Sequence, residues 1–176
     1  MNLEDVIDPE YGLQQDEWSL SKPTFGDEGQ LGVVGWSGRG TTHVKYYILK
    51  CNNCSQDTEM FGGGYFKSVK SALKRGSLPC GCSKKPEWSK EQYSILCSRK
   101  TMERGYTFLG FEGSWKGHKT LVKQSCEKHG EWSSTTISML LGRGDGCKAC
   151  QAESSRERNT KPDEEMIASF FASGAF

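Results

Sequence analysis

The chain has 176 residues, of which 35% are hydrophobic, so it has too little apolar material for one large core. No apolar run reaches the roughly 18 residues that span a membrane, so we expect no membrane partner. The net charge of +1 is unevenly distributed: residues 1–30 carry −7 and residues 31–150 carry +10. This basic centre favours a polyanionic partner, although an ordinary solvated surface would also explain it.

Residues 1–30 are predicted to form an acidic N-terminal leader. Their sequence lacks the basic stretch and apolar run of a secretory signal, so we expect a cytoplasmic protein. In a reducing cytoplasm, clustered cysteines are more typical of metal sites than of disulfides. The eight cysteines and three histidines therefore become candidate metal ligands.

Residues 31–86 are predicted to form a first small module. An apolar strand at residues 44–49 leads into the sequence CNNC, and CGC follows about thirty residues later. If residues 65–75 form a helix, Lys67, Lys70 and Lys74 make one basic stripe, which could also be an ordinary solvated face.

Residues 87–106 are predicted to form a linker. Residues 88–104 read as a helix, with Ser89 as the N-cap and Gln92 completing a capping box. Cys97 lies in the middle of this helix without a partner at ligand spacing, so we expect it to be a buried small apolar residue.

Residues 107–158 are predicted to form a second module, and residues 159–176 a C-terminal helix. Strands are expected at residues 120–123 and 131–137, around the sequence CEKH. The sequence CKAC follows and enters a helix, where ligands at i and i+3 lie on one face.

The two modules match each other at an offset of 75 residues. The sequence GWSG at residues 35–38 aligns with GFEG at residues 110–113, and both are interpreted as turns that open their modules. His43 aligns with His118, and each is predicted to pack beside its strand, with ligand and nucleic-acid roles as alternatives. Beyond an eight-residue insertion the offset becomes 67. Duplication is the simplest explanation.

Four donors at these spacings in each module predict two structural Zn²⁺ ions, because zinc prefers thiolate and imidazole ligands in a closed tetrahedron. Disulfides or free thiols are the alternative. The predicted ligands are Cys51, Cys54, Cys80 and Cys82 in the first module, and Cys126, His129, Cys147 and Cys150 in the second.

The second module, KTLVKQSCEKHGEWSSTTISMLLGRGDGCKAC, resembles the treble-clef zinc fingers of bacteriophage proteins, which occur as tandem CapR-like repeats and beside homing endonucleases. This resemblance implies a small α+β fold in which each module has a knuckle, a β-hairpin and a short helix. It also implies a phage origin, hence a host cytoplasm, and a core position for Trp132. The first module departs from the pattern, because Cys54 replaces the histidine and CGC replaces CxxC.

The basic centre and the resemblance together predict a zinc-binding protein that binds nucleic acid, DNA rather than RNA, without catalysis. Acidic residues of the basic region are scattered, which argues against an enzyme. The alternative is an inhibitor or adaptor that binds a host protein through the leader or through Phe170 and Phe171. The predicted nucleic-acid contacts are Arg39, Lys67, Lys70, Lys74, Arg75, Lys119 and Arg143.

Overall fold

The computed structural model describes residues 1–41, 43–143 and 146–160, and the chain divides into two units, Met1–Trp88 and Ser89–Phe176. The predicted C-terminal helix lies outside the described residues from residue 161 onward, as do Phe170 and Phe171. Over the described ranges, no helix combines the length and the apolar character needed to cross a membrane.

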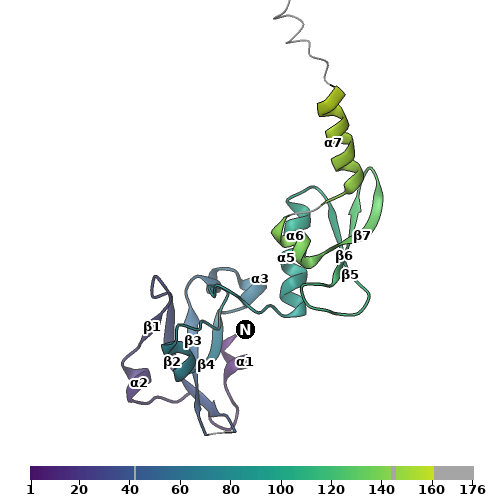
Figure 1. Cartoon of the computed structure of the whole chain (residues 1–176). Coiled ribbons are helices and arrows are strands. Elements are labelled where there is room, and N and C mark those ends of the chain that lie inside the picture. Colours follow the sequence, from purple (N-terminus) through teal and green to yellow (C-terminus); the bar gives the residue numbers. More distant parts are fainter. Residues whose placement is uncertain (42, 144–145, 161–176) are drawn as a thin grey trace, which may run out of the picture. The chain divides into compact units, whose positions relative to one another are not determined.

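The first unit is built on a four-stranded antiparallel sheet with the order β1-β2-β3-β4 (Figure 1). Leu31, Ile48 and Leu49 are fully buried, as expected for large apolar residues in strands. The strands are β1 (Thr24–Phe25), β2 (Leu31–Arg39), β3 (Lys45–Cys51) and β4 (Tyr65–Val69).

Short helices connect and flank these strands. They are α1 (Leu3–Val6), α2 (Glu17–Leu20), the 3-10 helix η1 (Cys54–Gln56), α3 (Thr58–Phe61) and α4 (Lys70–Lys74). The predicted helix at residues 65–75 is therefore wrong in its first half. Residues 65–69 pair with β3, with Lys67 opposite Ile48, because Phe66 is buried on the sheet. Lys67 consequently shares no helical stripe with Lys70 and Lys74.

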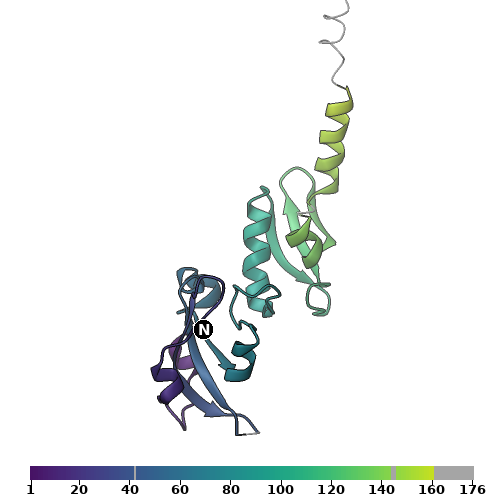
Figure 2. The ribbon, with the colours of Figure 1, turned by 60° about the vertical axis from the view of Figure 1, so that its left-hand side comes forward.

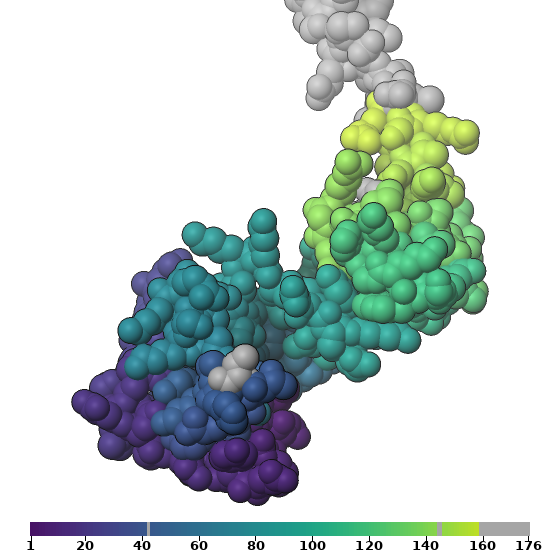
Figure 3. Space-filling model, turned by 60° about the horizontal axis from the view of Figure 1, so that its bottom comes forward, coloured from purple at the N-terminus to yellow at the C-terminus, as the bar shows by residue number. Residues whose placement is uncertain are grey.

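The acidic segment at residues 1–30 packs as part of the first unit. β1 pairs with β2, and Asp16 caps the N-terminus of α2. Its carboxylate accepts hydrogen bonds from Lys45 Nζ at 2.7 Å and the Tyr47 hydroxyl at 2.9 Å. The space-filling view shows these purple residues bordering the blue strand residues (Figure 3). The segment therefore contributes a strand, a helix cap and an ion pair to the unit.

The two glycine-rich sequences predicted as turns lie in strands instead. Residues 35–38 fall within β2, and Gly110 falls within β5 (Thr107–Glu112). Each strand has a register shift there, between Val33 and Gly35 and between Phe108 and Gly110. Gly110 has φ +112°, a conformation that other residues rarely adopt, so the glycine marks a β-bulge and not a turn. His43 and His118 are both exposed, so the prediction that they pack beside the strands is wrong.

The second unit has a three-stranded antiparallel sheet, β5-β6-β7, beside helix α5 (Figures 1 and 2). Its core contains Cys97, Val122, Ile137 and Leu140, all fully buried. The predicted helix is confirmed as α5, with the capping box of Ser89 and Gln92, and Cys97 is buried as expected. Besides β5, the elements are α5 (Lys90–Met102), β6 (Leu121–Cys126), β7 (Gly130–Thr136), α6 (Ile137–Gly142) and α7 (Lys148–Thr160).

Strand pairing follows the same register in both units. Gly32 pairs with Lys50 in the first unit, and the residues 75 positions later, Thr107 and Ser125, pair in the second. The β2 and β5 bulges occupy corresponding positions. Further along, Leu73 of α4 and Leu140 of α6 are both buried and lie 67 positions apart. The two sequence offsets therefore correspond to equivalent strand pairs and equivalent core positions.

Asp16 gives a test of the packing of the acidic segment. Burial by itself would raise the pKa of Asp16, but hydrogen bonds from Lys45, the Ser19 backbone and Tyr47 hold it well below the usual range. Asp16→Asn should lower the free energy of unfolding by about 1–3 kcal/mol near neutral pH, because a charge-assisted network is lost. Urea unfolding followed by tryptophan fluorescence measures this.

The pH dependence of stability separates the contribution of the Asp16 charge from that of its hydrogen bond at the start of α2. A depressed folded-state pKa contributes stability above the ordinary aspartate range, and that stability is lost as pH falls toward the folded-state value. The difference between the wild type and Asp16→Asn should therefore shrink as pH falls below about 4. Asp27→Asn, at an exposed acid of the same segment, is the matched control. Equal stability of the two variants would contradict the packed arrangement.

Candidate metal centres

The first donor cluster joins the end of β3 to the turn after α4. Cys51 is the last residue of β3, Cys54 begins η1, and Cys80 and Cys82 lie in the turn. The Sγ atom of Cys82 lies 3.7 Å from that of Cys51 and 3.9 Å from that of Cys54. An ideal Cβ on Gly81 would lie 2.6 Å from the Phe61 ring, so only glycine lets this turn pack so closely on the unit.

The second cluster joins the end of β6 to the start of α7. Cys126 ends β6, His129 lies in the turn before β7, and Cys150 lies in the first turn of α7, three residues after Cys147. The Nδ1 atom of His129 lies 3.6 Å from the Sγ of Cys126, 3.5 Å from that of Cys147 and 3.2 Å from that of Cys150. The two clusters hold the eight predicted ligands, and none of the eight cysteines forms a disulfide.

The geometry of both clusters fits a tetrahedral metal ion. Within each cluster, the four donor atoms all lie within 4.8 Å of one another. A tetrahedron with Zn–S bonds of about 2.3 Å has S···S edges of about 3.8 Å. The Sγ distances of 3.7 and 3.9 Å in the first cluster match such edges. Each cluster can therefore hold one metal ion, and its donor set is one that zinc prefers.

The ionisation of the second cluster links metal binding to pH. The hydrogen bonds with Glu153 and Cys126 raise the pKa of His129 to about 9. Burial by itself would raise the pKa of Cys126, but hydrogen bonds from His129 and the backbone lower it to about 6. A cation binds the deprotonated donors, so binding releases protons and weakens as pH falls.

Glu153 is a candidate supporting residue of the second cluster that sequence reasoning missed. Its Oε1 atom lies 2.9 Å from the Nε2 atom of His129, on the side of the ring opposite the donors. A carboxylate in this position fixes the orientation and tautomer of a ligating histidine. The signal was available in the sequence, because Glu153 lies one turn after Cys150 on the predicted helix.

The predicted nucleic-acid contacts lie on both units. In the first unit, Arg39 lies over the Trp36 ring at 5.4 Å, Lys67 over Tyr46 at 4.9 Å, and Lys70 over Trp18 at 4.6 Å. These cation–π contacts hold the three side chains against the protein surface. Arg39 is nonetheless exposed, and so are the other four predicted contacts: Lys74 and Arg75 at the end of α4, Lys119 in the β5–β6 loop and Arg143 after α6.

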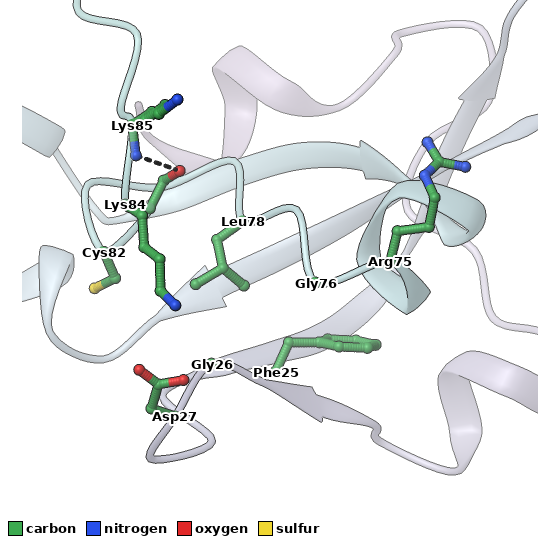
Figure 4. A pocket seen from close by; sticks show the side chains of 10 residues that line it. Phe25, Gly26, Asp27, Arg75, Gly76, Leu78, Cys82, Lys84 and Lys85 are labelled. Carbon is green, nitrogen blue, oxygen red and sulfur yellow. Dashed lines mark hydrogen bonds between the residues drawn. The ribbon is translucent and has the colours of Figure 1, made fainter.

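A hollow of about 630 Å³ beside the first cluster contains basic residues that the sequence analysis passed over. Lys84 and Lys85 line it together with Arg75, Asp27 and the ligand Cys82. Figure 4 shows Lys84 reaching into the hollow near Cys82 and Asp27, while Arg75 points away from it. Because a carboxylate faces the same space, the hollow is not a simple anion site.

These features describe a small α+β protein with two four-donor clusters, each able to hold one metal ion. Residues 17–83, which include the first cluster, match the CapR homology domain. Residues 86–151, which include the second cluster, match a family described as a protein of unknown function, DUF723. The two matches meet near the boundary between the structural units.

The chain is also similar to a "Putative endonuclease" of Escherichia phage T5. The two are 26% identical over 121 residues, which make up 68% of this chain and 46% of the phage protein. The chain therefore spans about half the length of this relative. No solved structure matches the chain.

We predict that the purified protein binds two metal ions per chain, and that a strong chelator unfolds both units. Structural zinc contributes about 10–16 kcal/mol to the folding of small fingers, which exceeds what thin cores supply. Cys126→Ser should bind one ion per chain. Elemental analysis and circular dichroism measure the two effects.

Cys97→Ala is the matched control for this prediction. Cys97 is buried in the core of the second unit, apart from both clusters, and burial raises the pKa of its thiol to about 12. The variant should lose stability but keep two ions per chain. Two ions in Cys126→Ser, or a folded protein after chelation, would contradict the assignment of the clusters.

The hydrogen bond between Glu153 and His129 gives a finer prediction. Glu153→Gln should weaken metal binding at the second cluster by roughly tenfold. This is the lower end of the range for carboxylates that orient a ligating histidine, and it is expected because Glu153 is half exposed. Glu157→Gln, one turn further along α7, is the control and should bind as the wild type does. Competition with a chromophoric chelator measures both affinities, and equal affinities would show that the carboxylate does not support the ligand.

Proposed function

We propose that the protein is a non-catalytic nucleic-acid-binding protein whose two modules are each held together by one zinc ion. The observation that carries this proposal is the pair of four-donor clusters. Both lie in residues 31–150, whose charge is +10, while residues 1–30, which pack into the first unit, carry −7. Closed four-ligand sites are typical of structural zinc, and a basic surface on a zinc-stapled scaffold is typical of nucleic-acid binding.

The two modules are proposed to be treble-clef fingers that arose by duplication. In support, each has a ligand pair after its central strand, a further strand, a helix and a second ligand pair. The shared register of β2-β3 and β5-β6 also favours a common origin. The resemblance to phage fingers and the T5 relative favour DNA as the partner.

The name of the phage relative makes an endonuclease the second candidate. We favour binding alone because the alignment covers 46% of the phage protein. The activity in that protein's name can therefore reside in the part that the alignment does not cover. Among the residues that the structure describes, groups of three or more His, Cys, Asp or Glu side chains close enough to hold a metal ion are limited to the two clusters, and each already has four donors.

Each unit is proposed to bind through its own exposed cations, which are Arg39, Lys74 and Arg75 in the first unit and Lys119 and Arg143 in the second. In the first unit, Lys67 and Lys70 on their aromatic rings support this binding. The acidic segment moderates binding to nonspecific sites. Since this segment packs into the first unit, deleting residues 1–30 would remove β1 and α2 as well as charge. Neutralising its exposed residues Glu10, Asp27 and Glu28 tests the moderating role without that damage.

We predict that the zinc-loaded chain binds duplex DNA with an affinity that falls steeply with salt. Each phosphate contact adds a slope of about −0.9 on a log–log plot. Lys74→Glu with Arg75→Glu should weaken binding and reduce the slope by about two contacts. Fluorescence anisotropy at several salt concentrations measures both.

Lys90→Glu with Lys100→Glu, which reverses two charges on α5, is the control and should leave binding unchanged. Absence of binding to any nucleic acid at low salt would overturn the proposal. Cleavage of DNA in the presence of Mg²⁺ would overturn its non-catalytic part.

A further inference from the structure

The loop between β5 and β6 carries a tryptophan, Trp115, that lies outside the buried core of the second unit. Trp115 is 40% exposed, whereas Trp36 is 7% exposed and the other three tryptophans are half-buried. The Trp115 ring lies against Phe111, with centroids 5.2 Å apart, and against Tyr93 at 5.8 Å. Its partners thus hold the ring in place and leave part of it open to solvent.

Hydrogen bonds order the loop that carries Trp115. The backbone N–H of Lys116 donates to the hydroxyl of Thr120 at 2.7 Å, and Thr120 is 1% exposed. The backbone N–H of Ser138, in α6, donates to the carbonyl of His118 at 2.9 Å. The first bond closes the loop on itself and the second ties it to α6, so little ordering is required on binding.

The charge of the loop selects the kind of partner. Residues 113–119 contain Lys116, His118 and Lys119, all exposed, and no acidic residue. Glu112, at the end of β5, is the nearest acid along the sequence. An exposed aromatic ring beside cations is complementary to a base followed by its phosphates, because bases stack on aromatic rings and phosphates pair with lysines.

We propose that Trp115 is a stacking platform for an unpaired base, so that the second unit binds single-stranded nucleic acid or an unpaired nucleotide. Lys116 and Lys119 contact the adjoining phosphates. At the offset of 75 residues Gly40 occupies the position of Trp115 in the first unit, so this feature belongs to the second unit alone. The proposal rests on the nucleic-acid function proposed above and deepens it.

The test compares variants of the full-length, zinc-loaded chain on a labelled single-stranded oligonucleotide and on its duplex form. Trp115→Leu keeps an apolar cover over Phe111 and Tyr93 but removes the aromatic face. It should weaken single-strand binding by roughly 5- to 150-fold, the range for loss of one stacked base, and affect duplex binding much less. Trp115→Phe should retain most of the affinity.

Salt dependence distinguishes stacking from charge. Lys119→Ala should reduce the salt slope on single strands by about 0.7, whereas Trp115→Leu should leave the slope unchanged. Metal content and circular dichroism check that each variant folds. If the wild type binds nucleic acid and Trp115→Leu binds single strands equally well, the stacking role of Trp115 is refuted. The exposed ring would then be better explained as a contact for a protein partner. If the wild type binds no nucleic acid, the proposed function itself fails.

Discussion

The rest of the structure depends on two tetrahedral donor clusters, each of which joins the end of a central strand to a segment about thirty residues or fewer further along the chain. The hydrophobic core alone is small: in the second unit it centres on Cys97, Val122, Ile137 and Leu140. A core of this size gives little net stability after the loss of chain entropy. A metal ion bound in each cluster would supply the missing free energy through four metal–ligand bonds that form only in the folded state.

This constraint also explains why the two units share a register. Cys51 and Cys126 must each reach the second ligand pair, so the ends of β3 and β6 are fixed relative to α4 and α6. The strands that pair with them, β2 and β5, then meet them in the same register, with a bulge at the same position. Sequence outside these fixed points is free to differ. Trp115 and the packed N-terminal segment are examples of such differences.

The sequence was sufficient for features that depend on local spacing. Ligand pairs two or three residues apart, and the capping box of Ser89 and Gln92, are recognisable because their geometry is set within one turn. Features set by distant contacts were not recognisable. The ion pair of Asp16 and Lys45 joins residues 29 positions apart, and it places an acidic segment in the fold that composition alone suggests is a free leader. Residues 65–69 form a strand because β3 lies beside them, although Lys67 is spaced from Lys70 and Lys74 as on a helix.

The central claim is that metal binding and folding are one event in each unit. The most direct measurement is a titration of the chelator-treated protein with Zn²⁺, followed by the dispersion of its backbone amide NMR signals. The account predicts collapsed signals without metal and a fully dispersed spectrum at two equivalents, with no further change beyond that point. A dispersed spectrum before any metal is added would contradict the claim.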